Sequence, residues 1–272
     1  MSLLSTELLS VFLSPTQVLA VRRRGMSRHI VDKRAQAVAI RTGDGWAAVV
    51  DAFAAVLREV RRERVQVILS SHFAHYQLVP WRDDLQDSEE ELAVVRLAYG
   101  ETFGEAAARW SIRLSDESPG RPRIAAALDS GLLDAIRQTA GAAKVRLISM
   151  QPYLSAAVNH WRDLFDRSHS RWLVLHEENR VCLALLDQAR WRWVRCVRAG
   201  ADWCERLPDM VEHEIMLAGS GDVSGEVLVF APQQPTLSLR TGTRLPFRML
   251  RLASLRGYSP SEDGPYGLAL IG

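Results

Sequence analysis

The sequence predicts an α/β protein built from two successive rounds of strands and helices. Each round begins with short apolar runs separated by turns, continues with an amphipathic helix and returns to a buried strand. Hydrophobic residues make up 47% and charged residues 24% of the 272 residues, a mixture typical of a folded globular chain. A chain of this length accommodates two halves of about 100–150 residues each. These observations favour a duplicated architecture of two lobes, with mixed central sheets flanked by helices.

A strand hairpin opens the first round. The apolar runs 8–13 and 18–21 flank Ser14-Pro15-Thr16, where a proline suits a turn and not the centre of a strand. Apolar residues then recur at helical spacing over residues 45–62, which predicts a helix with one apolar face. The other elements predicted for this round are strands at 35–40, 65–69, 72–79, 110–114, 124–128 and 145–149, and helices at 88–101, 130–140 and 153–165.

Two helix starts carry a capping signal. Ser88-Glu89-Glu90-Glu91 has the capping-box arrangement, in which Ser88 caps the helix and a glutamate three residues later bonds back to it. Asp129 or Ser130 is expected to cap the helix that follows the strand 124–128.

The second round repeats the first at reduced size. Its predicted elements are a meander of strands at 172–175, 181–186 and 191–197, a helix at 202–217, and strands at 227–230 and 247–252. Tight turns are expected at Glu177-Glu178-Asn179 and at Asp187-Gln188. We therefore predict a first lobe at 1–166, with an inserted subdomain at about 71–128, and a smaller second lobe at 167–272.

The composition excludes several classes of protein. A net charge of +2 gives no whole-molecule field that would draw the chain onto nucleic acid or a membrane. Three cysteines, at positions 182, 196 and 204, are too few and too unevenly spaced for a disulfide framework, which favours a reducing cytoplasm. No apolar run reaches the roughly 18 residues that a membrane span needs. Residues 1–13 lack the basic region and cleavage site of a signal peptide.

Three stretches of the chain carry a resemblance to a known family. They are Val67-Ile68-Leu69-Ser70-Ser71-His72-Phe73 with the later Val79-Pro80-Trp81, then Ile148-Ser149-Met150-Gln151-Pro152-Tyr153, and Gly267-Leu268-Ala269-Leu270. They are similar to PilM/GspL-type proteins of type IV pilus and type II secretion assembly, including their mannose-sensitive-pilus relatives. The resemblance implies a duplicated actin-like, ribonuclease-H-like fold. It also implies a scaffold at the cytoplasmic side of an inner-membrane assembly platform, whose membrane-anchored partner docks through a cytoplasmic peptide.

The actin-like fold often binds ATP with Mg²⁺, and the resemblance implies where a nucleotide would lie. The first turn, Ser14-Pro15-Thr16, has hydroxyls but no aspartate or glycine, and proline removes a backbone donor. The second turn, Glu177-Glu178-Asn179, has no glycine, and its two carboxylates repel phosphate unless Mg²⁺ bridges them. Gly219-Ser220-Gly221 precedes the late strand that paired glycines should follow. The residues left for a nucleotide, if one binds, are Ser14, Thr16, Glu177, Asn179, Gly219 and Gly221.

Other catalytic and metal-binding patterns are incomplete. His72 and His75 form an HxxH pair without a third ligand nearby, so ordinary polar residues at a strand end are the favoured interpretation. The three cysteines with His176 lack the tight pairs of structural zinc sites. Ser70 and Ser71 precede His72, but neighbours in a strand point to opposite faces, and the chain has no GxSxG motif. We therefore assign no catalytic and no metal-binding residue, and we expect no cofactor.

Basic and aromatic clusters remain as candidate partner surfaces. Arg22-Arg23-Arg24 and the arginines at 58, 61, 62 and 64 would suit lipid head groups or an acidic tail, although Glu59 and Glu63 make a solvated helix end the favoured interpretation of the second cluster. In Trp191-Arg192-Trp193, strand alternation predicts both tryptophans on one face, either packing under a sheet or forming a partner site. A nucleic-acid site would need aromatic stacking residues woven into a basic stripe, and this stretch comes nearest to that pattern.

These inferences predict a non-enzymatic docking protein of a type IV pilus or type II secretion-like platform. It would be cytoplasmic, held at the inner membrane only indirectly, through the tail of a membrane partner. The alternative is a nucleotide-binding ATPase or phosphotransferase of the same fold. A third class, a metal-dependent enzyme that uses His72, His75 and the cysteines, stays open to metal analysis. The sequence leaves the position of the docking groove undefined.

Overall fold

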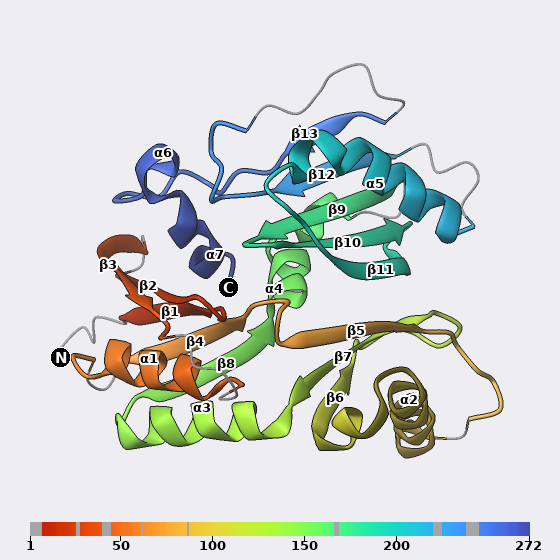
Figure 1. Ribbon diagram of the computed structural model, residues 1–272, viewed down its shortest axis with the longest axis horizontal. Helices are drawn as coiled ribbons and strands as arrows, with labels where there is room; N and C mark the ends of the chain where they lie inside the picture. Colours follow the sequence, from red (N-terminus) through yellow and green to blue (C-terminus); the bar gives the residue numbers. More distant parts are fainter. Residues whose placement is uncertain are drawn as a thin grey trace.

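The computed structural model describes residues 7–25, 28–39, 45–60, 63–85, 87–165, 169–219, 225–237 and 245–272. Within these residues, the strands form two five-stranded sheets and one three-stranded sheet (Figure 1). The strands are β1 (Leu8–Leu13), β2 (Gln17–Arg24), β3 (His29–Ala37), β4 (Arg64–Leu69), β5 (Ala74–Val79), β6 (Trp110–Leu114), β7 (Arg123–Asp129), β8 (Arg146–Pro152), β9 (Ser170–Glu177), β10 (Arg180–Asp187), β11 (Arg190–Arg198), β12 (Glu226–Phe230) and β13 (Phe247–Met249).

The two five-stranded sheets have the same topology. The first has the order β3-β2-β1-β4-β8 and the second the order β11-β10-β9-β12-β13. In each sheet, three consecutive strands pair antiparallel, and the first of them then pairs parallel with the fourth strand. A fifth strand continues the parallel part. The predicted duplicated α/β architecture with mixed central sheets is confirmed.

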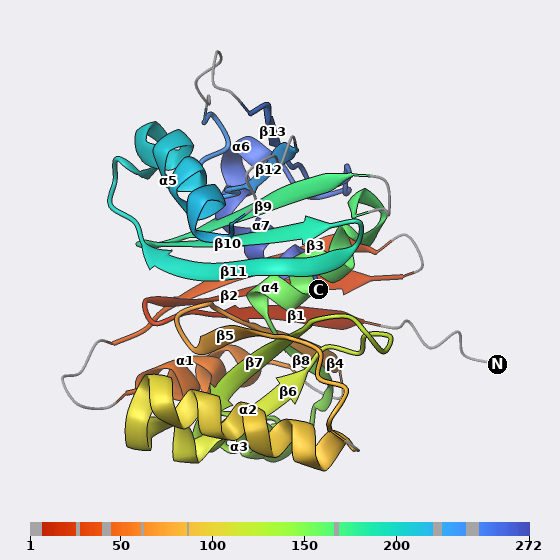
Figure 2. The ribbon, with the colours of Figure 1, turned by 90° about the vertical axis from the view of Figure 1, so that its right-hand side faces the viewer.

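Helices cover the outer faces of the sheets and fill the space between them (Figures 1 and 2). The helices are α1 (Ala47–Leu57), α2 (Ser88–Phe103), α3 (Ser130–Ala142), α4 (Tyr153–His160), α5 (Trp203–Leu217), α6 (Pro260–Asp263) and α7 (Gly267–Leu270), with 3₁₀ turns η1 (Gly104–Arg109), η2 (Arg162–Leu164) and η3 (Gly264–Tyr266). Helices α1 and α3 pack on the first sheet, and α5 packs on the second. One apolar core, which includes Phe12, Tyr153, Leu173 and Leu268, joins both sheets. The two lobes are therefore held together over a continuous buried surface.

The three-stranded sheet, in the order β5-β7-β6, forms a separate layer with α2 and η1. Its aromatic core contains Tyr99, Phe103 and Trp110, and the His75 ring stacks on Trp110 with ring centroids 4.1 Å apart. Strand β5 also lies against β11, the edge strand of the second sheet (Figure 1). This layer therefore contacts both lobes.

The structure corrects several predicted boundaries in the first round. Strand β3 begins at His29, earlier than the predicted 35–40, because an edge strand rich in charged residues lacks the apolar signal on which the prediction rested. Residue 40 lies outside the described residues. The cap of α2 is Asp87, not Ser88, and its carboxylate accepts the N–H groups of Glu89 (2.8 Å) and Glu90 (2.9 Å). Asp129 caps α3, as predicted.

Three elements are shorter than predicted. The predicted helix 153–165 ends at His160, and the 3₁₀ turn η2 follows, because Leu164 N–H bonds the carbonyl of Trp161 three residues earlier. Strand β13 covers only Phe247–Met249 of the predicted 247–252. Helix α1 covers Ala47–Leu57 of the predicted 45–62, and residues 61–62 lie outside the described part of the chain.

The prediction that Trp191 and Trp193 share a face is wrong. The pairing of β10 with β11 shifts register between Leu185 and Leu186, which leaves an extra residue between the two tryptophans. Trp191 therefore belongs to the core between the lobes, whereas Trp193 packs on the opposite face under α5. There the Trp193 indole Nε1 donates to the buried carboxylate of Glu214 (2.8 Å). Both tryptophans thus pack within the fold.

Candidate functional site

The first hairpins of the two lobes meet at the cleft between the sheets. The turn between β1 and β2 and the turn between β9 and β10 line one cavity of about 40 Å³. Its other walls come from the segment after β4, from the segment after β12 and from α7. The lining residues are Phe12, Ser14, Pro15, Thr16, Gln17, His72, Glu177, Glu178, Asn179, Gln233 and Leu268.

The first turn satisfies its own backbone. Ser14 Oγ donates to the carbonyl of Gln17 (2.9 Å) and accepts the Gln17 N–H (3.2 Å), and Ser14 N–H donates to the same carbonyl (3.0 Å). Pro15 occupies the corner, where its missing N–H costs nothing. The Ser14 hydroxyl is consequently engaged within the turn and is not directed at a ligand.

The second turn reaches across to the first lobe through Glu177. Glu177 is only 2% exposed. One oxygen accepts the hydroxyl of Ser70, and the other accepts the backbone N–H of Ser71 (2.8 Å). Both serines follow β4, at the end of the first sheet that faces the cleft. Burial, reinforced by the Glu177 charge, raises the pKa of the Tyr153 hydroxyl nearby. A buried carboxylate thus bridges the lobes with two charge-assisted hydrogen bonds.

Further contacts join the same segments at the rim. The carboxylate of Glu178 accepts the hydroxyl of Thr16 (2.5 Å), and the Glu178 carbonyl lies 2.9 Å from Nε2 of His72. From the start of β10, Arg180 Nη1 donates to the carbonyl of Ser71 (2.9 Å). The two hairpins are therefore joined directly, side chain to side chain and side chain to backbone.

The structure brings together some of the residues predicted for a nucleotide. Ser14, Thr16, Glu177 and Asn179 all line the cavity. Asn179 has φ = +57°, a left-handed conformation that asparagine tolerates in tight turns. Gly219 follows α5 and does not line the cavity, and Gly221 lies outside the described residues.

Sequence reasoning missed the role of Ser70 and Ser71. Sequence patterns present them only as candidate nucleophiles, whereas in the structure they supply the hydrogen bonds that hold Glu177. The available signal was their position directly after a buried parallel strand, because the carboxyl ends of such strands line the cleft of an open α/β sheet.

The residues at the cleft do not fit ATP with Mg²⁺, the group that the resemblance implies. A cavity of about 40 Å³ has little more room than one water molecule, whereas small-ligand sites occupy about 300–1,000 Å³. The Glu177 carboxylate already occupies the donors that would face a phosphate, and Glu178 adds a second negative charge beside it. As arranged, the cleft is filled by the protein's own carboxylate.

The histidines and cysteines do not converge on a metal site. Within the described ranges, no group of three or more His, Cys, Asp or Glu side chains is placed to hold a metal ion. Cys182 and Cys196 lie opposite each other in β10 and β11, facing the core between the lobes. His176 faces the other way and stacks on Trp203, with ring centroids 4.1 Å apart, and burial lowers the pKa of His176 to about 4.

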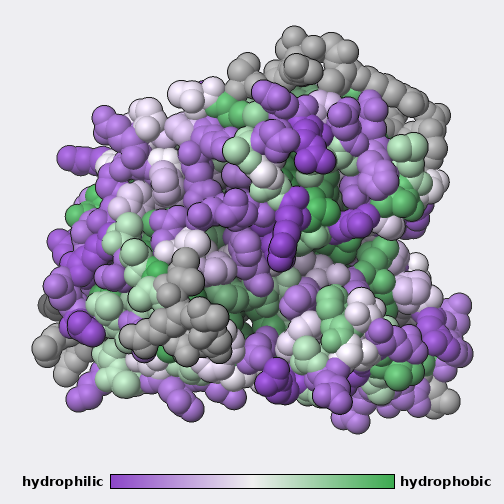
Figure 3. All heavy atoms as spheres, in the orientation of Figure 1, coloured by the Kyte–Doolittle hydropathy of each residue, from purple (hydrophilic) through white to green (hydrophobic). Residues whose placement is uncertain are grey.

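A second hollow lies between the starts of α1 and α3 on one side and α2, η1 and β6 on the other. It has a volume of about 670 Å³ and is lined by Trp46, Arg96, Ala108, Arg109, Trp110, Ser111, Asp129, Ser130 and Gly131. Figure 3 shows a hollow with apolar atoms between the part that carries α1 and α3 and the part that carries β6 and α2. We call it the interlayer groove.

The walls of the interlayer groove are fixed by contacts around the start of α3. Trp46 Nε1 donates to Asp129 Oδ1 (3.2 Å), and the same oxygen caps α3 by accepting the Leu132 N–H (3.1 Å). A Cβ atom on Gly131 would lie 2.9 Å from Trp46, so glycine permits the indole to lie over the helix start. Arg96 and Arg109 are exposed, with no carboxylate partner among the described residues. The groove thus combines a fixed aromatic wall with two available cations.

The two arginine clusters differ in their pairing. Arg22 pairs with Glu63 (3.3 Å), Arg24 pairs with Glu7, and the buried Arg23 donates to Ser10 (2.7 Å). Arg23 also donates to the carbonyl of Gly272 (3.4 Å), so all three arginines of the first cluster bond other residues of the chain. Arg58 and Arg64 of the second cluster are exposed, and residues 61–62 lie outside the described residues.

Solved structures resemble this fold over nearly its whole length. The cytoplasmic domain of EpsL, an inner-membrane component of the type II secretion system of Vibrio cholerae, matches with a TM-score of 0.61 and 11% identity, over 98% of this chain and 95% of that one. A PilM–PilN type IV pilus biogenesis complex matches with a TM-score of 0.67 and 11% identity, over 97% and 94% of the two chains. A Bacteroides thetaiotaomicron protein with an actin-like ATPase fold matches with a TM-score of 0.54 and 8% identity, over 83% and 81%.

Other comparisons add no relatives. No protein-family model matches the sequence, and no curated protein matches it. Among the residues that the structure describes, no helix is long and apolar enough to cross a membrane. The repeated strand order and these three structures together establish that the chain has an actin-like fold, the fold also found in the EpsL cytoplasmic domain and in PilM.

Proposed function

We propose that this protein is a non-enzymatic docking protein of a pilus or secretion assembly platform. In this proposal it works at the cytoplasmic face of the inner membrane and binds the cytoplasmic tail of a membrane-anchored partner. Two solved structures with this fold support the proposal: one is a domain of an inner-membrane secretion component, and the other is a pilus biogenesis complex. Shared fold alone does not fix function, so the argument rests on the site.

The observation that carries the proposal is the bridge made by Glu177. Its buried carboxylate joins the lobes through Ser70 and Ser71, at the cleft where a nucleotide would lie in an actin-like protein. A cleft filled in this way favours a protein that acts by binding another molecule elsewhere on its surface. We therefore also propose that no nucleotide cofactor is bound.

The interlayer groove is the site that we propose for the partner's tail. Its volume of about 670 Å³ suits several side chains of an extended peptide. Tryptophan and arginine are the residue types that most often anchor interfaces, and the groove offers Trp46, Arg96 and Arg109. The available cations favour a tail with carboxylates next to an apolar residue.

A binding experiment tests this proposal. The probes are synthetic peptides of the cytoplasmic tails of single-span inner-membrane proteins encoded by the pilus and secretion genes of the source organism. We expect one peptide to bind saturably, and we expect Arg96→Glu with Arg109→Glu to weaken it by at least about tenfold. Arg113→Glu, at an exposed arginine of β6 outside the groove, is the matched control and should leave affinity unchanged.

Two results would count against the proposal in different ways. If no tail binds to the folded protein, the docking function is wrong. If a tail binds equally to the wild type and to the double variant, the function survives and the placement in the interlayer groove is wrong.

A further inference from the structure

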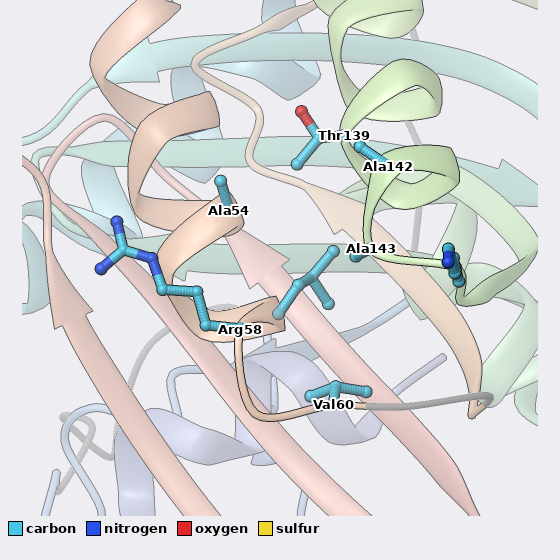
Figure 4. Close-up of a pocket in the computed structure, with 8 residues that line it drawn as sticks. Ala54, Arg58, Val60, Thr139, Ala142 and Ala143 are labelled. Carbon is cyan, nitrogen blue, oxygen red and sulfur yellow. The ribbon is translucent and has the colours of Figure 1, made fainter.

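A third hollow lies at the far end of the first lobe, between the C-terminal ends of α1 and α3. It has a volume of about 670 Å³. Figure 4 shows its walls, with Ala54 from α1 facing Thr139 and Ala142 from α3. Leu57 and Val60 are buried beneath it. We call it the helix-end groove. Small side chains on its walls and an apolar floor leave room for side chains from another surface.

The rim of the helix-end groove is positively charged. Arg58 and Lys144 line it and are exposed. Arg64 and Arg146 begin the adjacent strands β4 and β8, where they lie opposite each other. For none of these four cations does the described part of the chain provide a carboxylate partner. The charge of the rim therefore favours binding of a negatively charged surface.

The backbone of Lys144 has a conformation that is unfavourable for lysine. It follows the C-cap of α3 with φ = +57°, the left-handed position that glycine usually occupies after a helix. It is one of only two lysines in the sequence, at positions 33 and 144. A lysine in this conformation is unusual, and it lies at the rim of the groove together with Arg58.

A complementary surface lies at the opposite end of the same molecule. Six acidic residues fall between 83 and 91, at the start of α2, with no basic residue among them. Glu89, Ala93 and Leu97 follow at four-residue spacing on α2, all three are exposed, and Leu97 is 66% exposed. We call this stripe the α2 ridge. It presents a carboxylate followed by a small and then a large apolar side chain.

The two surfaces cannot pair reciprocally. Along the longest axis of the molecule, the ends of α1 and α3 lie at one extreme and α2 at the other (Figure 1). Figure 2 shows α2 lying across the face that forms this second end. A contact between the groove of one copy and the ridge of another is therefore heterologous, and it can repeat from molecule to molecule.

We propose that the helix-end groove binds the α2 ridge of a second copy of this chain, so that the protein associates head to tail. Leu97 enters the apolar floor, and Glu89 meets Arg58 and Lys144 at the rim. The inference is independent of the docking function, because it uses neither the interlayer groove nor the cleft between the lobes.

A mixing experiment tests the head-to-tail contact. In sedimentation velocity, we expect the wild type to form larger species as its concentration rises, and to dissociate in high salt because the rim charges are screened. A groove variant, Arg58→Glu with Lys144→Glu, and a ridge variant, Glu89→Lys with Leu97→Lys, should each weaken self-association by at least about tenfold. An equimolar mixture should associate again, because the ridge of the first variant is intact and so is the groove of the second.

A second groove variant separates binding from folding. Lys144→Gly removes the charge but suits the left-handed backbone, so it should fold at least as well as the wild type and still associate more weakly. Arg137→Glu, at an exposed arginine of α3 outside the groove, is the control and should associate like the wild type.

Three results would overturn the proposal. One is that the wild-type protein stays monomeric at every concentration. This result overturns the proposal also if the monomer binds phosphatidylglycerol vesicles through its cations. Another is self-association that both charge-reversed variants retain. The third is a mixture of the two variants that remains monomeric although each variant is folded by circular dichroism.

Discussion

The first hairpins of the two lobes occupy the same place in the same topology, yet they are stabilised in opposite ways. Leu13 ends β1 where Glu177 ends β9. After Leu13, the turn closes on itself through Ser14, whose hydroxyl bonds the backbone of Gln17. At Glu177 the side chain leaves its own lobe and bonds Ser70 and Ser71 of the other.

The equivalent hairpins of a duplicated fold thus make different contacts. The first hairpin is bonded to its own backbone, and the second is bonded to the opposite lobe. The apolar core between the sheets already holds the lobes together, so the carboxylate bridge adds to a closed arrangement. The second hairpin therefore acts as the structural link between the lobes, and the segment after β4 receives it.

Removal of the Glu177 carboxylate should cause the largest loss of stability among the changes to the two hairpins. Glu177→Ala leaves the Ser70 hydroxyl and the Ser71 N–H buried without their acceptor, and hydrogen bonds to charged groups contribute about 2 kcal/mol each. We expect the free energy of unfolding to fall by roughly 4 kcal/mol in urea denaturation. Glu178→Ala, in the same turn but exposed, is the control and should cost less than about 1 kcal/mol. Equal losses for the two variants would refute the assigned roles.

Lowering the pH should reduce the stability that the second hairpin contributes, and it should leave the contribution of the first hairpin unchanged. Burial lowers the pKa of His176 from 6.5 to about 4, whereas β1 contains no titratable side chain. Between these pH values the unfolded chain binds the proton and the folded chain does not. The stabilisation is therefore complete above about pH 6.5 and is lost as pH falls toward 4, by about 3 kcal/mol at most.

The measurement is the free energy of unfolding against pH, for the wild type and for His176→Phe. Phenylalanine keeps a ring against Trp203 and removes the titration. We expect the slope between pH 6.5 and 4 to be shallower in the variant. An unchanged slope would show that another group controls the acid sensitivity.

The first hairpin should respond only locally. Ser14→Ala removes hydrogen bonds within one turn, so we expect a loss of about 1 kcal/mol in the free energy of unfolding. Thr16→Val removes an exposed bond to Glu178 and should cost about 0.5 kcal/mol. If either change matched Glu177→Ala in urea denaturation, the contrast between the hairpins would fail.

The turn between β10 and β11 provides a third case, because it makes no described contact across the cleft. Gln188 and Ala189 join β10 to β11, and both have positive φ, at 51° and 58°. Left-handed backbone costs an alanine about 1 kcal/mol, so Ala189→Gly should stabilise the protein by up to that amount. Thermal unfolding would show a small rise in Tm, and a fall would show that the alanine side chain makes a contact that this account omits.

The fold could be predicted from the sequence, and the closure of the cleft could not. Alternating and helical periodicities located most strands and helices, and the repeated order of elements indicated the duplication. Strand β3 was misplaced because its edge position favours charged residues, and the Trp191–Trp193 prediction failed because no sequence signal marked the bulge. The bridge between Glu177 and Ser70 joins residues 107 positions apart, a pairing that no local pattern reveals.

The most direct test of the central claim is titration of the wild-type protein with Mg²⁺-ATP and Mg²⁺-ADP in a calorimeter, with a thermal-shift control. Because Glu177 occupies the donors of the cleft, we predict no saturable heat and no shift in Tm at nucleotide concentrations near about a millimolar. Saturable binding in the micromolar range would contradict the account. It would show that the bridge opens to admit a nucleotide, and it would favour the ATPase or phosphotransferase alternative over the docking function.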